Sequence, residues 1–334
     1  MADVVLIHGA WAGSWVWDSL QDGLRDAGHR PHAVDLPGNG SDATPLAEVS
    51  LQRYVEHVGA LIETLPGPIH LVAHSGGGIT ATAVAERYAE RIAGVTYVAG
   101  MMLPSGMGFG ELCAELARDF PEVSGIGPYL EAAPGGSRVP GDAACALFFH
   151  DAPAVAAITA ARRLTVQPDG GRDIAAQWTA ARFGRLPRLY IEATQDRSVL
   201  PRVQQRMQQL VPGAERVRLD CGHAPQLAMP DALLAALLDF FARQPHPVRR
   251  PVYCIALNTP NLQGASPCST EPCSPAPCSR CSANPLWPPT RCAGSTTGCR
   301  PATRRRSTLV SNRACSPPKA SKWKSPVPAV AATW

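Results

Sequence analysis

The sequence predicts an α/β protein built on a mostly parallel, doubly wound sheet of about six strands. Short apolar, β-branched runs alternate along the chain with longer segments of helical period, a pattern typical of a parallel sheet with helices on both faces. The 334 residues are 45% hydrophobic and 17% charged, which is enough apolar material for a sizeable core. Fold class therefore follows from pattern and composition together.

The predicted strands cover residues 4–9, 31–36, 69–75, 94–100, 188–194 and 215–220. The predicted helices lie near residues 14–27, 51–64, 77–89, 201–210 and 230–243. In an open sheet of this kind, ligands bind outside the carboxyl ends of the strands. Candidate functional residues are therefore sought in the loops that follow each strand.

Residues 103–186 interrupt this alternation. The segment contains no convincing strand but several Ala-rich, helical pieces that Pro and Gly separate. An insertion of this length between two buried strands is better explained as a helical cap over the strand ends than as a structureless loop. We expect the cap to supply most of the substrate pocket.

A break in composition near Gln244 divides the chain into a predicted domain, residues 1–244, and a tail, residues 245–334. The tail has twelve Lys and Arg against one acidic residue, Glu271, and so carries +11, which leaves −7 on the domain. It is rich in Pro, Ser, Cys and Arg without apolar periodicity, so we expect it to be disordered. A nucleic-acid partner would depend on this tail alone and is not expected.

The positions of the cysteines and of the apolar runs predict whether the protein binds metal, associates with a membrane or is exported. Eight of the 11 cysteines lie in the tail, where only one pair of the cluster has C-x-x-C spacing and no His is near, so no metal site is predicted. No run of about 18 apolar residues exists, and the start MADVVLIHGA lacks the features of a signal peptide. We expect a soluble, cytoplasmic protein without a membrane partner.

The strongest signal for chemistry is LVAHSGGG at residues 71–78, where an apolar strand runs into Ser75 and then into glycines that open a helix. A serine on such a tight turn needs small neighbours two residues before and after it, here Ala73 and Gly77. The usual form is G-x-S-x-G, from which Ala73 departs by one methyl group. This pattern favours Ser75 as a nucleophile.

Two plainer interpretations of this turn are a solvated serine beside glycines and a cradle for phosphate. A phosphate loop would have G-x-x-x-x-G-K-[ST] or G-x-G-x-x-G after the first strand, and neither is present. Residues 1–244 contain no lysine at all. The nucleophile interpretation is therefore preferred.

A serine hydroxyl needs a base to remove its proton. Of nine histidines, His223 follows the last predicted strand in RLDCGHAPQ, which brings it to the sheet edge that carries Ser75. His74 should point away from the serine along its strand. His8 ends the first strand and is expected to be a hydrogen-bonded structural residue. His223 is the predicted base.

The imidazole in turn needs a carboxylate to set its tautomer. Asp196 lies in IEATQDRSVLP directly after a predicted strand, and it completes the chain order Ser, Asp, His. Glu192 and Asp220 compete, but both fall within predicted strands. Asp196 is preferred because of its place at a strand end.

The remaining candidates would bind the developing oxyanion or the substrate. The backbone N–H of Gly76 and that of Ala10, in the loop after the first strand, are the predicted oxyanion donors. Side chains expected to contact substrate are Trp11, Phe149, His150 and Trp178, with a simple packing role equally open for His150. No cofactor is predicted.

The loop HGAW, the turn VAHSGGG and the segments TQDRSVLP and CGHAPQLAMPDAL together resemble the methylesterase and hydroxynitrile lyase branch of the α/β-hydrolases, most of all its bacterial esterases. The resemblance covers about residues 3–243. It implies an α/β-hydrolase fold with a helical cap, a triad of Ser75, Asp196 and His223, and cleavage of small carboxylic esters. Some bacterial relatives are similar to pyrethroid-type carboxylesterases.

The lyases of this branch place a threonine in the first loop and a lysine after the catalytic histidine, where this sequence has Gly9 and Ala224. The resemblance therefore disfavours cyanohydrin cleavage, since no cation is offered to the departing anion. We expect a serine esterase that works through an acyl-enzyme on a small ester. A hydroxynitrile lyase, a carbon–carbon hydrolase and a non-catalytic binding protein of this fold are the alternatives, and the sequence leaves a homodimer open.

Overall fold

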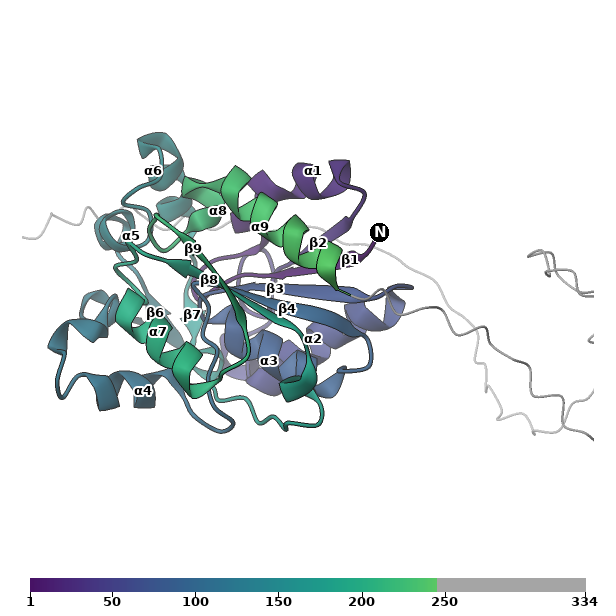
Figure 1. Ribbon diagram of the computed structural model, residues 1–334. Helices are drawn as coiled ribbons and strands as arrows, with labels where there is room; N and C mark the ends of the chain where they lie inside the picture. Colours follow the sequence, from purple (N-terminus) through teal and green to yellow (C-terminus); the bar gives the residue numbers. More distant parts are fainter. Residues whose placement is uncertain (245–334) are drawn as a thin grey trace, which may run out of the picture. The chain divides into compact units, whose positions relative to one another are not determined.

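The computed structural model describes residues 1–244 as one sheet with helices on both faces and a cap at one end (Figure 1). The predicted tail and its cysteine cluster lie outside the described residues. All pairings in the main sheet are parallel, in the order β2-β1-β3-β4-β8-β9. Its strands are β1 (Asp3–Ile7), β2 (Arg30–Val34), β3 (Ile69–His74), β4 (Ile92–Val98), β8 (Arg188–Ala193) and β9 (Glu215–Leu219). The predicted mostly parallel sheet of about six strands is confirmed.

Five α-helices flank this sheet within the described residues, and a sixth, α8, is a single turn. Proline occupies the first turn of α7, α8 and α9, where the missing N–H costs no hydrogen bond. Ser50 caps α2 by accepting a hydrogen bond from the Arg53 N–H at 3.2 Å. The helices are α1 (Asp18–Asp26), α2 (Leu51–Thr64), α3 (Gly77–Arg87), α7 (Pro201–Leu210), α8 (Pro225–Ala228) and α9 (Pro230–Arg243).

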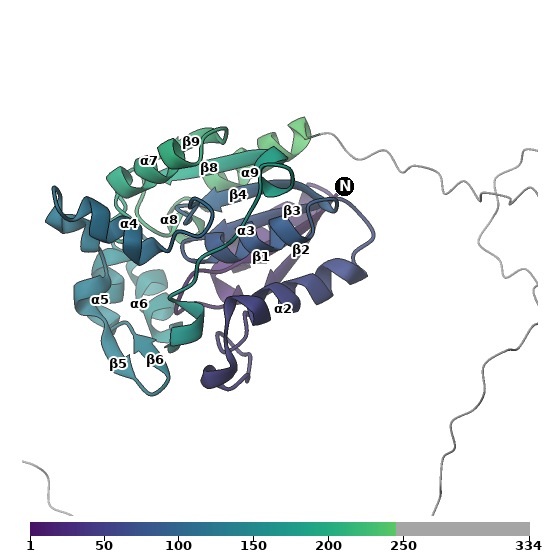
Figure 2. The same ribbon diagram turned by 90° about the horizontal axis from the view of Figure 1, so that it is seen from below.

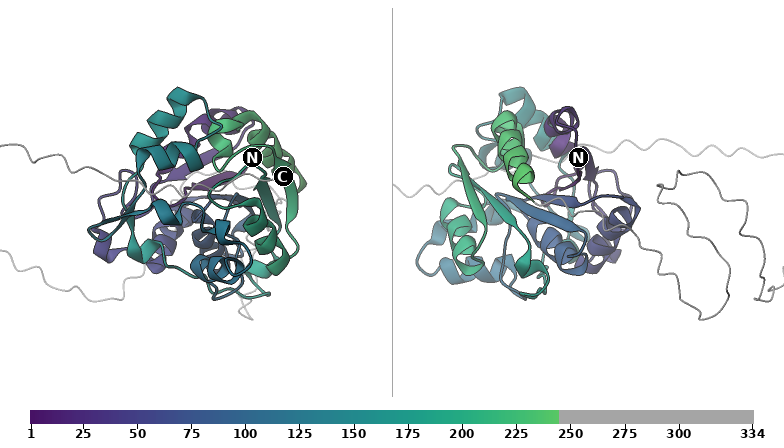
Figure 3. Two further views of the ribbon diagram at one scale, coloured as in Figure 1. Left: turned by 90° about the vertical axis from the view of Figure 1, so that its left-hand side faces the viewer. Right: turned by 45° about the vertical axis from the view of Figure 1, so that its right-hand side comes forward.

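Alternation along the strands divides the core into two layers. Val4 and Leu6 of β1 pack on one face with α1 and α9, and Val5 and Ile7 pack on the other with α2, α3 and α7. Figure 2 shows α2 and α3 side by side, and Figure 3 shows α9 beside α1 over the opposite face. The four inner strands, β1, β3, β4 and β8, are buried almost completely on both faces, whereas the edge strands β2 and β9 are partly exposed.

The segment predicted to form a cap lies at the carboxyl ends of the strands (Figures 1 and 2). It contains three helices, α4 (Phe109–Leu116), α5 (Gly141–Leu147) and α6 (Ala154–Arg163). It also contains a small antiparallel sheet of β5 (Glu131–Ala133), β6 (Gly136–Arg138) and β7 (Gln167–Pro168).

The prediction that this segment contains no strand is therefore wrong. Its strands have three residues or fewer, too short for a period of two to show in the sequence. Gly135, in the left-handed region at φ 75°, turns β5 into β6. A β-carbon on Gly136 would lie 2.0 Å from the Gln167 carbonyl oxygen, so the close approach of β6 and β7 depends on glycine.

Within residues 1–244, none of the helices combines the length and the apolar character needed to cross a bilayer.

Candidate active site

Ser75 occupies a sharp turn between β3 and α3. Its φ of 50° is in the left-handed region, which costs a residue with a side chain about 1–3 kcal/mol. The turn is held by main-chain hydrogen bonds: the Ser75 N–H donates to Val98 O at 3.1 Å, and its carbonyl accepts from Gly78 at 3.0 Å and Met101 at 2.9 Å. The backbone thus keeps the hydroxyl at the carboxyl end of the central strand.

The small residues around this turn have a steric cause. A β-carbon on Gly77 would lie 2.3 Å from the carbonyl oxygen of His8, closer than any real contact. Ala73, two residues before the serine, is wholly buried between the neighbouring strands. The expected need for small residues on both sides of Ser75 therefore has a physical basis.

His223 and Asp196 form a continuous chain of hydrogen bonds with Ser75. The Nε2 atom of His223 lies 3.1 Å from Ser75 Oγ, and its Nδ1 lies 2.8 Å from Asp196 Oδ2. All three side chains are buried. An ionised carboxylate only accepts hydrogen bonds, so Nδ1 carries the proton and Nε2 is left to accept from the serine hydroxyl. The arrangement can therefore draw a proton from Ser75.

Asp196 is held from three sides. Its Oδ1 accepts from the N–H groups of Ser198 at 2.7 Å and Val199 at 2.9 Å, and its Oδ2 accepts from the Gln204 side chain at 3.1 Å. The competing carboxylates are engaged elsewhere. Glu192 faces Arg216 and Arg218, and Asp220 accepts from Thr194 and Gln195.

Gln204 is a residue that the sequence interpretation missed. Its side chain is wholly buried on α7, and its amide also accepts from the Ala193 N–H at 3.1 Å and donates to Val199 O at 2.7 Å. It therefore links the end of β8 to the Asp196 loop. The only signal in the sequence is a polar residue on the face of α7 that carries Val203 and Met207.

His74 packs behind His223. Its ring centroid lies 4.7 Å from that of His223, and its Nε2 lies 2.7 Å from the His223 carbonyl oxygen. Burial, and the proximity of His223, lower the pKa of His74 to about 3. The ring is therefore neutral and donates through Nε2 to the backbone of the residue that carries the base.

The two predicted oxyanion donors lie next to each other. A β-carbon on Gly76 would be 3.6 Å from the Ala10 nitrogen. No described residue accepts a hydrogen bond from the N–H of Ala10 or Gly76. Both donors are therefore free to bind an anionic oxygen beside Ser75.

His8 orients the Ala10 donor. Its Nε2 accepts from the Leu36 N–H at 3.0 Å, so its Nδ1 carries the proton and donates to Gly9 O at 2.7 Å. In a trans peptide the Ala10 N–H points opposite to that carbonyl. Burial lowers the pKa of His8, which keeps the ring in this neutral form. The structural role expected for His8 thus bears directly on the candidate oxyanion hole.

A cavity of about 230 Å³ opens beside Ser75. Most of its wall is apolar and comes from both the sheet edge and the cap. Its apolar side chains are Ala10, Trp11, Ile79, Met101, Phe109, Ile126, Leu130, Ile174 and Val199. Its polar and charged side chains, other than Ser75, are Cys113, Ser124, Arg172, Asp173 and Ser198. Burial raises the pKa of Cys113 to about 11, so this residue presents a neutral thiol.

Of the four side chains expected to contact substrate, only Trp11 lines this cavity. Phe149 packs against Phe148, and Trp178 packs against Phe183 while its indole N–H donates to Leu103 O at 2.9 Å. Neither side chain belongs to the lining of this cavity, and the direction of a side chain on a cap cannot be read from sequence spacing.

His150 also lies outside the lining of this cavity. Its Nε2 donates to Gln195 O at 2.9 Å, one residue before Asp196. The neighbouring Asp151 accepts from the Gly222 N–H at 2.5 Å, one residue before His223. These two cap residues therefore hold the loops that carry Asp196 and His223, and the alternative of a packing role describes the contacts of His150 better than substrate contact.

Comparison with known proteins identifies the family of this chain. A model of the alpha/beta hydrolase family matches residues 4–237, so the chain belongs to this family. It is 28% identical over 246 residues to putative methylesterase 14 of Arabidopsis thaliana, which covers 70% of this chain and 70% of that protein. It is also 28% identical over 259 residues to a pyrethroid hydrolase of Sphingobium wenxiniae, which covers 72% of this chain and 88% of that protein.

Among solved structures, polyneuridine aldehyde esterase superimposes with a TM-score of 0.63 at 22% identity. The match covers 72% of this chain and 99% of the esterase. Identity this low shows a shared fold rather than a shared substrate. The predicted α/β-hydrolase fold is thereby confirmed.

Proposed function

We propose that this protein is a serine hydrolase that cleaves small carboxylic esters through an acyl-enzyme. The observation that carries the proposal is the unbroken chain from Ser75 Oγ through His223 to Asp196, beside two unengaged N–H groups. The names of the relatives, a methylesterase and a pyrethroid hydrolase, support an ester as the substrate.

In the first half-reaction, His223 Nε2 removes the proton of Ser75 as its oxygen attacks the ester carbonyl. The N–H groups of Ala10 and Gly76 bind the oxyanion, and Asp196 stabilises the imidazolium. When the intermediate collapses, the carbon–oxygen bond to the alcohol breaks, and the alcohol leaves with the proton from His223. The acyl group remains on Ser75.

In the second half-reaction, a water molecule loses a proton to His223 and attacks the acyl carbonyl. The same two N–H groups bind the second oxyanion. Breakage of the bond to Ser75 frees the carboxylic acid, and the proton on His223 returns to the serine. The enzyme ends in its initial protonation state.

The cavity beside Ser75 favours an apolar acyl or alcohol group. Phe109, Ile126 and Ile174 offer an apolar surface, and the cavity of about 230 Å³ suits a small to medium substituent. Burial of such a group would contribute about 25 cal/mol of favourable free energy for each Å² of apolar surface removed from water.

The decisive experiment compares wild type with Ser75→Ala on a panel of nitrophenyl and methyl esters and on one cyanohydrin. We expect ester turnover by wild type only, and labelling of wild type only by a fluorophosphonate. A thermal unfolding midpoint within a few degrees of the wild-type value would show that the Ser75→Ala variant is folded. Release of aldehyde and cyanide without ester turnover would identify a lyase, and undiminished turnover by Ser75→Ala would refute the proposed nucleophile.

A further inference from the structure

The residue after the Ala10 donor has an unusual backbone. Trp11 has φ 62°, in the left-handed region that a bulky side chain normally avoids. Such a conformation costs about 1–3 kcal/mol and persists only where its surroundings impose it. The peptide between Ala10 and Trp11 is part of the same loop as the oxyanion donor, so whatever imposes this conformation also shapes the oxyanion hole.

Hydrogen bonds from the cap reach every polar group of Trp11. Its N–H donates to Gln167 Oε1 at 3.0 Å, and its carbonyl accepts from the Thr165 N–H at 2.7 Å. Its indole N–H donates to the carbonyl of Ser137 at 3.1 Å. Ser137 belongs to β6 and Gln167 to β7, so the small cap sheet binds the loop after β1 that carries Trp11.

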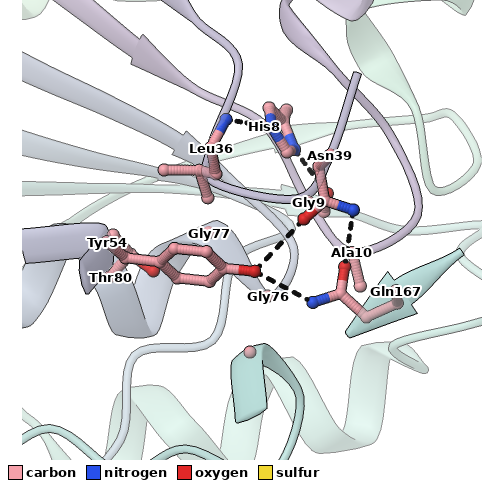
Figure 4. A pocket seen from close by; sticks show the side chains of 11 residues that line it. His8, Gly9, Ala10, Leu36, Asn39, Tyr54, Gly76, Gly77, Thr80 and Gln167 are labelled. Atoms are coloured by element: carbon pink, nitrogen blue, oxygen red, sulfur yellow. Dashed lines mark hydrogen bonds between the residues drawn. The ribbon is translucent and has the colours of Figure 1, made fainter. Parts of the chain in front are cut away.

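Gln167 is itself fixed in a ring of three buried side chains (Figure 4). Its Nε2 donates to the Tyr54 hydroxyl at 3.3 Å, Tyr54 donates to Asn39 Oδ1 at 3.1 Å, and Asn39 Nδ2 donates back to Gln167 Oε1 at 3.3 Å. The ring borders a small cavity of about 20 Å³ that Ala10 and Gly76 also line. It therefore lies directly behind the candidate oxyanion hole.

The direction of every bond in this ring follows from one backbone group. The Trp11 N–H can only donate, so the atom of Gln167 that meets it must be the carbonyl oxygen. The Gln167 nitrogen then faces Tyr54, and Asn39 must present its nitrogen to Gln167 and its oxygen to Tyr54. Burial raises the pKa of Tyr54 to about 12, so the phenol keeps the proton that it donates. A single arrangement satisfies all three side chains.

We propose that Gln167 is a positioning residue that holds the Ala10–Trp11 peptide from the cap and so aligns the oxyanion hole. This inference rests on the proposed function, because it concerns transition-state stabilisation in ester cleavage. Asn39 and Tyr54 keep the Gln167 amide in the productive orientation. The cap thus acts on the chemical step as well as on substrate binding.

The test is Gln167→Met, which keeps the length of the side chain and removes the acceptor. Removal of an oxyanion donor costs about 10²- to 10³-fold in kcat, and misalignment should cost less, about 10- to 100-fold. KM should stay within about twofold, because the cavity beside Ser75 is not lined by Gln167. The inhibition constant of a trifluoromethyl ketone, whose adduct with serine carries an oxyanion, should rise in parallel.

Two variants separate positioning from packing. Gln167→Glu retains an oxygen that accepts from the Trp11 N–H, so it should recover most of the lost activity. Ser137→Ala keeps the carbonyl that binds the indole and removes only a hydroxyl 3.3 Å from it, so it should resemble wild type. If Gln167→Met does not fold, Tyr54→Phe replaces it. In that variant kcat should fall, and the inhibition constant of the ketone should rise, by about two- to fivefold.

The outcomes distinguish failure of the Gln167 proposal from failure of the proposed function. Equal kcat and equal ketone inhibition in wild type and a folded Gln167→Met, or in Tyr54→Phe where that variant is used, would overturn the inference and leave the proposed function intact. If wild type hydrolyses no ester yet reacts with a fluorophosphonate, the rate of that labelling replaces kcat in the same comparison. A wild type that reacts with neither reagent would overturn the proposed function and this inference with it.

Discussion

The core of the molecule and its cap contribute to the candidate site by different physical means. In the core, strand register and two strand-end loops bring Ser75, Asp196 and His223 into one hydrogen-bonded chain. In the cap, short irregular elements line the cavity and bind loops of the core, as Gln167 binds Trp11 in the loop after β1. A regular sheet therefore specifies where chemistry can occur, and the cap adjusts the positions of the core loops and shapes the cavity.

The largest expected effect comes from the core. Asp196→Asn should lower kcat by about 10⁴-fold, because an amide that donates to His223 Nδ1 imposes the wrong tautomer. Steady-state kinetics on a nitrophenyl ester measures this. Asp220→Asn serves as the matched control, since Asp220 is bound to Thr194 and Gln195 and should leave kcat within a few fold. A larger loss of kcat in Asp220→Asn than in Asp196→Asn would show that Asp220, and not Asp196, is the carboxylate that supports His223.

The next largest effect tests whether the position of Asp196 depends on its hydrogen bond with Gln204. Gln204→Met should lower kcat by about 10- to 100-fold, since a small misplacement of Asp196 misaligns His223. It should also reduce the free energy of unfolding by about 1–3 kcal/mol, because the Ala193 N–H loses its acceptor. Gln205→Met, on the same helix but in contact with Glu192, is the control. Equal kinetics in the two variants would show that Asp196 is held by its own loop alone.

The cap residues that line the cavity beside Ser75, such as Ile174, should affect selectivity rather than the chemical step. Ile174→Trp fills part of the cavity beside Ser75, so kcat/KM for esters with bulky acyl groups should fall by about tenfold relative to acetyl esters. Competition between a bulky and a small ester in one reaction measures the ratio directly. Ile158→Trp, at an exposed position of α6, provides a change of equal size on the surface. An unchanged ratio in Ile174→Trp would place the substrate elsewhere.

The smallest effect is expected for Trp178→Phe. This residue packs against Phe183 and does not line the cavity beside Ser75, so kcat and KM should stay within about twofold. Stability should fall by about 0.5–1.5 kcal/mol from the lost hydrogen bond to Leu103 O. Chemical denaturation and ester kinetics on the same sample separate the two quantities. A large rise in KM would restore Trp178 as a substrate contact.

The residues of the core were within reach of the sequence. Ser75 ends a predicted strand, and Asp196 and His223 each follow one; because parallel strands end at one edge, their proximity could be anticipated. The residues of the cap were not, because Phe109 or Ile174 has no periodic neighbour that shows which way its side chain faces. Gln204 and Gln167 were missed for a related reason: a lone buried amide has no signature until its partners are known.

The α/β class, the apolar runs of the inner strands and the strand ends at which chemistry could lie are all legible in the sequence, because these depend on periodicity and on local turn residues. The cap side chains that line the cavity, and the contact of Gln167 with Trp11 across 156 positions of chain, became known from the folded molecule. Such contacts depend on how separate elements pack, and packing is set by the shapes of all the partners together.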